Sequence, residues 1–204
     1  FVLLVLSSVG TAFVVERQVG FDRAYENQIR MSPKAQDRLA DATPEQKEQG
    51  AKIGIAMTKY ISYGAFVLIT IFLALYSLIL WASFNFGLGA NTTYSQVFAV
   101  TMYSALPYLV VTLLTIISLY FGGNAEGYDY KNPVGTNLAY FMPDAAPWLK
   151  GLLGSFDIVK LWSVVLQVIG MAVIAKKTIA QSAMVVGIFW FIGVVVATVG
   201  AAFS

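Results

Sequence analysis

The sequence contains neither cysteine nor histidine. Their absence excludes disulfides, thiolate and imidazole metal ligands, cysteine or histidine nucleophile and base pairs, and a histidine pH switch. Charge is scarce as well, because charged residues make up 12% of the chain, whereas soluble domains have roughly 25%. The net charge of +2 provides no basic patch for nucleic acid. An enzyme is therefore the least favoured class, and a nucleic-acid-binding role has no support.

The few charges are segregated along the chain. Of its 13 basic and 11 acidic residues, 15 lie between Glu16 and Lys59, whereas the 66 residues from Tyr60 to Ala125 include none. Hydrophobic residues make up 58% of the chain, and the mean hydropathy is +0.71. Long uncharged runs of this kind predict an all-α polytopic integral membrane protein.

Five apolar runs predict transmembrane helices, given that a crossing needs about 20 residues. The first run is too short and is interpreted as the end of a truncated span, with a signal-peptide core as the alternative. Pro107 lies near the middle of the third run and predicts a kink there, with a gating hinge as the alternative. The five predicted spans are 1–15, 60–84, 95–121, 157–175 and 178–204.

The polar segment 16–59 predicts short helices that connect the first two spans. Ser32 and Thr43 each precede a proline, as helix N-cap residues often do, and Thr43 with Gln46 matches a capping box. A solvated connector near the membrane is the favoured interpretation, and a platform for a partner protein is the alternative. One face of its first helix has apolar residues four apart, namely Phe21, Tyr25 and Ile29.

Residues 124–154 are too polar to span the membrane and too apolar for a free linker, so we expect a loop on the membrane surface. Ser155 is expected to be the N-cap of the next helix, with Asp157 in its first turn.

In the last span small residues recur every four positions and include Gly187 and Gly193. This ridge predicts close helix packing within the chain, with a homo-oligomer contact as the alternative.

The acidic residues show no pattern that predicts chemistry. None lies inside an apolar run, which weighs against a proton-coupled transporter and against an intramembrane carboxylate enzyme. Those after the connector lack the spacing of metal ligands, and the sequence has no phosphate-binding loop or serine-hydrolase motif. We therefore predict no metal and no cofactor.

Several stretches, in order, resemble the Yip domain family of five-span membrane proteins, which is named after eukaryotic members that interact with Ypt and Rab GTPases. The matching stretches are Pro33–Gly50 of the connector with Thr43–Gln46, Gly89 with Tyr94–Val100 and Tyr103–Pro107, Asn132–Leu138 as in bacterial members, and Ser155–Trp162 with Gly170. Candidate interaction or structural residues from the packing and the resemblance are Pro107, Asn132, Pro133, Asn137, Asp157, Trp162, Gly187 and Gly193.

The resemblance implies an integral protein of the bacterial cytoplasmic membrane. A Rab-binding role is not carried over, because bacteria lack such partners in the same form. Many packing features and no set of catalytic residues predict a non-enzymatic adaptor or accessory subunit in the lipid bilayer. It is expected to bind another integral membrane protein through its spans and the loop 124–154. The alternatives are a transporter or channel component, or an accessory subunit of a larger energy-converting or efflux complex.

The orientation in the membrane has two conflicting indications. Most Lys and Arg residues lie in the connector and in the loop 124–154, which favours the cytoplasm for that face. The family topology instead implies a cytoplasmic N-terminus, which would place both segments on the other side. The sequence leaves both orientations open.

Overall fold

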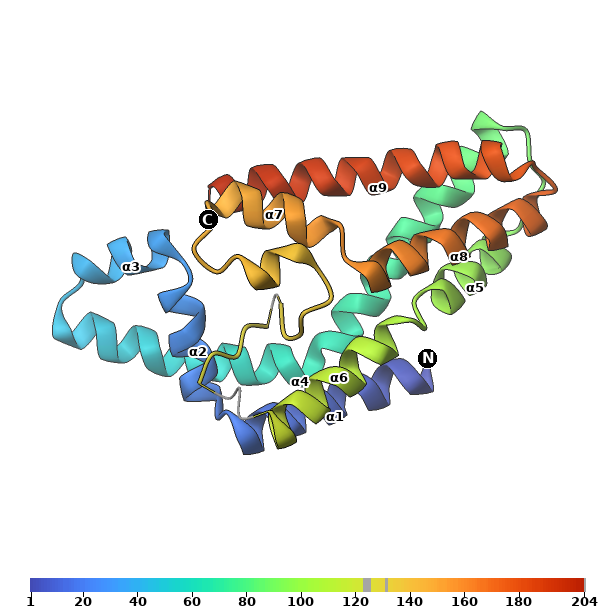
Figure 1. Ribbon diagram of the computed structural model, residues 1–204. Helices are drawn as coiled ribbons and strands as arrows, with labels where there is room; N and C mark the ends of the chain where they lie inside the picture. The colour runs from blue at the N-terminus through green and yellow to red at the C-terminus, as the bar shows by residue number, and fades with distance from the viewer. Residues whose placement is uncertain (123–125, 131, 204) are drawn as a thin grey trace. The chain divides into compact units, whose positions relative to one another are not determined.

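The computed structural model describes residues 1–122, 126–130 and 132–203, and every regular element in these ranges is a helix (Figure 1). Within them, four helical segments are long and apolar enough to cross a membrane. A bent pair, α1 (Val2–Gln18) and α2 (Phe21–Arg30), would add a fifth crossing. The protein is an all-α polytopic membrane protein, as predicted. The four segments are Pro44–Gly87, Tyr94–Phe121, Ile158–Ala175 and Ile179–Ala202.

The described chain forms two compact units, each built from two stretches of sequence. The first consists of Phe1–Phe66 and Thr112–Gly135, and the second of Val67–Val111 and Thr136–Phe203. The elements after α2 are α3 (Pro33–Ala40), α4 (Pro44–Ala82), the π-helix η1 (Ser83–Gly87), α5 (Tyr94–Ser104), α6 (Tyr108–Phe121), the 3-10 helix η2 (Leu138–Phe141), α7 (Pro147–Ser155), α8 (Ile158–Ala175) and α9 (Ile179–Ala202).

The helix starts predicted in the connector are confirmed. Ser32 caps α3, because its hydroxyl accepts the backbone N–H of Ala35 at 3.4 Å. At the start of α4 the Thr43 hydroxyl accepts the Gln46 N–H at 3.3 Å, and the Gln46 amide oxygen accepts the Thr43 N–H at 2.9 Å. This reciprocal pair satisfies backbone donors that the first helical turn leaves without a partner.

The helix that begins at Pro44 does not end within the connector, as the predicted short helices would. It runs unbroken for 39 residues into the span, and η1 then extends the helical segment to Gly87. Good helix formers without proline favour this continuity. The Tyr25 ring packs against this helix at Gly54, 2.2 Å from where a Cβ atom would stand, so a larger residue does not fit at this position. The connector thus includes α2, α3 and the first turns of α4.

The second unit is a helical bundle with a small apolar core. Leu80, Phe84 and Met171 are completely buried in it. Polar side chains also join three helices. The Tyr76 hydroxyl of α4 donates to the side-chain amide oxygen of Gln167 in α8 at 3.0 Å, and the Gln167 amide nitrogen donates to the Thr101 hydroxyl of α5 at 3.4 Å. Such interhelical hydrogen bonds supply polar partners that lipid lacks.

The stretch predicted as a loop over residues 124–154 contains two helices in its described part. These are η2 and α7, and α7 begins with Pro147 in its first turn. The predicted N-cap at Ser155 is wrong, because Ser155 ends α7 and its hydroxyl donates to the Gly151 carbonyl at 2.8 Å. Asp157 caps the next helix instead, since its carboxylate accepts two backbone N–H groups there.

Helix α7 packs against the C-terminal half of α9 (Figure 1). A Cβ atom on Gly151 would lie 2.6 Å from the Ala197 carbonyl oxygen and 2.8 Å from the Ala201 methyl group, so only glycine fits. By contrast, a Cβ atom on Gly187 or Gly193 would meet nothing within 4 Å. The small-residue ridge of α9 therefore admits α7 at one end and has open space at the two glycines.

This difference predicts opposite effects of one substitution at two glycines. Gly151→Ala forces α7 away from α9 and should destabilise the protein by about 1–3 kcal/mol, as overpacking does. Gly187→Ala meets no atom and should raise helix stability slightly, because alanine favours helices over glycine. Thermal unfolding in detergent measures both variants, and equal shifts for the two would contradict the packing of α7 on α9.

Candidate functional site

Asp157 joins two segments that are 20 residues apart. Its Oδ1 accepts the backbone N–H groups of Val159 at 2.9 Å and of Lys160 at 3.1 Å, which caps α8. Its Oδ2 accepts the Asn137 side-chain amide at 3.3 Å and the Thr136 hydroxyl. Two of the predicted residues, Asn137 and Asp157, therefore meet. Because a carboxylate offers about four lone-pair positions, the four donors leave none for a metal, and the contact is structural.

The other predicted residues do not join this contact. Pro107 is buried at the interruption between α5 and α6, where the sequence predicts a kink. Trp162 is 51% exposed on α8. Asn132 and Pro133 are half-buried in the first unit, and the Asn132 backbone N–H donates to the Asp129 carbonyl at 3.2 Å.

A cavity that the sequence did not predict lies among α2, α3 and the start of α4. Its volume is about 530 Å³, and it opens to the surface. Apolar side chains of all three helices line it, with charged side chains among them. The lining residues are Tyr25, Glu26, Ile29, Arg30, Gln36, Leu39, Ala40, Lys47, Ala51 and Ile55. We name this cavity the connector pocket.

Hydrogen bonds hold the walls of the connector pocket. The Gln36 amide of α3 donates to the Arg30 carbonyl at the end of α2, at 2.5 Å. The Arg30 guanidinium donates to the Asn27 side-chain oxygen at 3.0 Å and to the Glu126 carbonyl at 3.2 Å. The buried Asn27 amide donates to the Tyr128 carbonyl at 3.2 Å. The contacts made by Arg30 and Asn27 fix α2 against the loop that follows α6.

The aromatic residues of this loop reinforce the attachment. Tyr128 is buried, and its ring packs edge-on against Tyr130 with 5.0 Å between the ring centroids. The Tyr130 hydroxyl accepts the Ser62 hydroxyl of α4 at 3.1 Å. Burial raises the pKa of Tyr128 well above its ordinary value. The phenol therefore stays neutral at physiological pH and serves packing.

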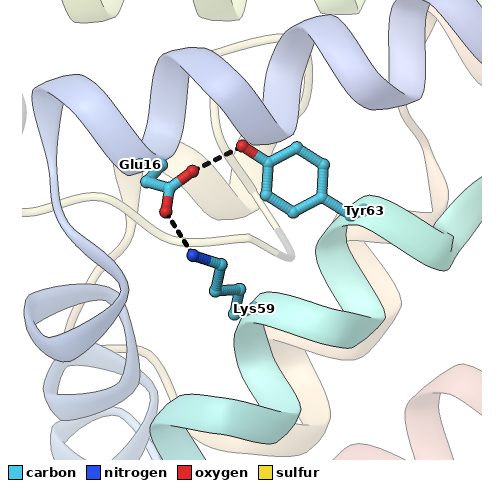
Figure 2. Close-up of polar contacts among 3 residues, drawn as sticks. All are labelled: Glu16, Lys59 and Tyr63. Carbon is cyan, nitrogen blue, oxygen red and sulfur yellow. Dashed lines mark hydrogen bonds and ion pairs between the residues drawn. The ribbon is translucent and has the colours of Figure 1, made fainter.

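An ion pair with an added hydroxyl joins α1 to α4 (Figure 2). The Lys59 ammonium donates to Glu16 Oε1 at 2.7 Å, and the Tyr63 hydroxyl donates to Glu16 Oε2 at 2.5 Å. These donors, Lys59 first, lower the pKa of Glu16 from its ordinary value. The stabilisation is therefore complete above the ordinary carboxyl pKa and is lost as the pH falls through the lowered value.

The sequence contained part of the signal for the connector pocket. Tyr25 and Ile29 belong to the predicted apolar stripe of α2, and both line the cavity. Leu39 and Ile55 face the cavity from α3 and α4. No periodicity within one helix shows that three helices converge, because that depends on the turns after Arg30 and Ala40.

The Asp157 contact predicts a local loss of order when the carboxylate is removed. Asp157→Ala should destabilise the first turn of α8 by about 1–2 kcal/mol, as the loss of an N-cap does, and should also release Thr136 and Asn137. Hydrogen exchange should accelerate in residues 136–141 and 158–160. Asp144→Ala is the matched control, because Asp144 is an exposed acid in the same segment. Equal exchange in the two variants would contradict the structural role.

The Glu16–Lys59 pair predicts rescue by charge reversal. Glu16→Lys and Lys59→Glu alone each place like charges together, so the thermal midpoint should fall in each single variant. The double variant restores an ion pair across the same two helices and should regain most of the loss. A double variant as unstable as the sum of the two single variants would show that the pair does not couple α1 to α4.

Among the described residues, no group of three His, Cys, Asp or Glu side chains could hold a metal ion. In comparisons with known proteins, no curated protein and no solved structure matches the chain. The family model of the Yip1 domain matches residues 1–200, which is nearly the whole chain. The match agrees with the resemblance found in the connector, the third span and the start of the fourth. The chain therefore belongs to the Yip1 domain family.

Proposed function

We propose that this membrane protein is a non-enzymatic adaptor or accessory subunit that binds another integral membrane protein through the connector pocket. The observation that carries the proposal is the pocket itself, an open cavity of about 530 Å³ formed by three helices of the polar connector. The resemblance of the chain to bacterial family members supports a location in the bacterial cytoplasmic membrane.

The chemistry of the pocket suits an apolar segment with mixed charges at its edges. Ile29, Leu39 and Ile55 offer apolar surface from three different helices, and Glu26, Arg30 and Lys47 contribute both signs of charge. Protein interfaces commonly combine an apolar centre with a polar rim, and a few side chains in such a centre supply most of the affinity. An amphipathic helix or loop of a partner would meet both requirements.

The rigidity of the walls supports binding rather than catalysis. Gln36 and Arg30 hold α2 and α3 together, and Arg30 and Asn27 also bond the loop after α6. A preformed pocket needs little ordering when the partner arrives, so more of the contact energy becomes affinity. The chain provides no histidine or cysteine for proton transfer or nucleophilic attack near this surface.

A substitution that fills the pocket tests the proposal. In native membranes, a photoreactive phenylalanine derivative at the exposed lining position Ala40 should cross-link to a discrete membrane-protein partner. Ala51→Trp places an indole ring inside the pocket and should lower this cross-linking about tenfold or more, as the loss of an interface centre does.

Ala56→Trp is the matched control, because Ala56 is exposed on the same helix and does not line the pocket. It should leave the cross-linking unchanged. Thermal unfolding of both variants shows whether the fold survives. No discrete partner at Ala40, or an equal loss in both variants, would contradict binding through the connector pocket.

A further inference from the structure

Helix α7 runs antiparallel to α9 along the half of α9 that leads to the C-terminus. At the middle of α7, Gly151 lies against Ala197 and Ala201. Five residues later the Phe156 ring packs edge-on against the Trp190 ring, with 5.4 Å between the centroids. The contacted position on α9 therefore moves back from residues 197–201 to residue 190 as α7 advances.

This direction places the end of α7 beside the middle of α9. Helix α9 has 24 residues, none of them charged, so at 1.5 Å per residue its length is about 36 Å. Trp190 is its twelfth residue and lies about 17 Å from either end. If α9 crosses the membrane, as its length and apolar composition indicate, Phe156 lies deep within the membrane thickness.

The segment before α7 reaches the same level. Ala139 of η2 lies 3.9 Å from where a Cβ atom on Gly154 would stand, near the end of α7. Thr136 and Asn137 bond to Asp157, directly after Phe156. Residues 136–139 therefore lie beside the deep end of α7. The chain then leaves this level and comes back to it through α7.

The side chains that this segment exposes are those of a lipid-facing surface. Leu138 and Phe141 of η2 are 60% and 69% exposed, and Trp148 and Phe156 are about half exposed. Between residues 136 and 156 the only charged residues are Asp144 and Lys150. Adjacent exposed apolar side chains of this size indicate contact with lipid or with another protein rather than with water. Continuity with the apolar surface of α9 favours lipid.

We propose that residues 136–156 are inserted into the membrane, so that α7 and α8 form a single crossing interrupted at Phe156 and Asp157. The sequence predicted a loop on the membrane surface instead. An interruption at membrane depth requires that the freed backbone groups find partners. Asp157 meets this requirement by accepting two N–H groups of α8, and the donors on Thr136 and Asn137 compensate the burial of its charge.

The depth of single spin labels tests the proposal directly. Because the chain has no cysteine, each single-cysteine variant has one labelling position. The full chain is reconstituted in phosphatidylcholine vesicles, and label depth is measured from relaxation by oxygen and by a water-soluble nickel chelate. The labelled variants are Leu138→Cys, Trp148→Cys, Phe156→Cys and Ile158→Cys, with Ile192→Cys as the deep reference and Glu48→Cys as the aqueous reference.

Labels at positions 138, 156 and 158 should be as deep as the label at position 192, and the label at position 148 should be shallower. Depths at 138 and 156 equal to that at 148, or nickel exposure like that at 48, would overturn the proposal. All labelled positions are exposed, and among them Phe156 gives up a described ring contact, the one with Trp190. If Phe156→Cys does not fold, Ile158→Cys reports on the other side of the same interruption. The measurement does not depend on the connector pocket or its partner.

Discussion

Hydrocarbon offers no hydrogen-bond partners to the peptide backbone, and this constraint is met by side chains at three helix starts in the apolar part of the protein. Thr93 with Gln96, and Thr178 with Gln181, form reciprocal caps that satisfy the first turns of α5 and α9. Asp157 does the same for α8 with a single carboxylate. At these three helix starts, polar side chains therefore complete the backbone.

The polar connector works under the opposite condition, because it contains most of the charge. There the ion pair of Glu16 with Lys59 joins α1 to α4, and the Arg30 guanidinium bonds both a side chain and a distant carbonyl. Exposed ion pairs contribute little stability by themselves. The value of these contacts is geometric, since one joins α1 to α4 and the other holds α2 against the loop that follows α6.

The predictions from sequence were reliable where one helix could be considered alone. Four of the uncharged runs overlap the helical segments that are long and apolar enough to cross a membrane, and the Thr43–Gln46 pattern marked the start of α4. The predictions were wrong where contacts with residues distant in the sequence determine the local structure. Ser155 and Asp157 are both plausible caps, and Thr136 and Asn137, about 20 residues earlier, bond to Asp157. Helix α7 was missed because nine residues are too few for a span, although Pro147 is a common first-turn signal.

The hydrogen bonds made by Asp157 bear on what the second unit can do in the membrane. An ion pathway or proton relay needs an acidic group with an unoccupied lone pair or a route for its proton. Asp157 is the acid closest to the apolar helices of this unit, and all four of its acceptor positions are occupied by donors of the chain. Gln167 is likewise bonded to Tyr76 and Thr101. Asp157 and Gln167 thus hold segments of the unit together, whereas the buried polar atoms of Ser163, Ser182 and Trp190 have no hydrogen-bond partner among the described residues. The hydrogen bonds of Asp157 and Gln167 therefore support the proposed adaptor over an ion pathway through these two residues.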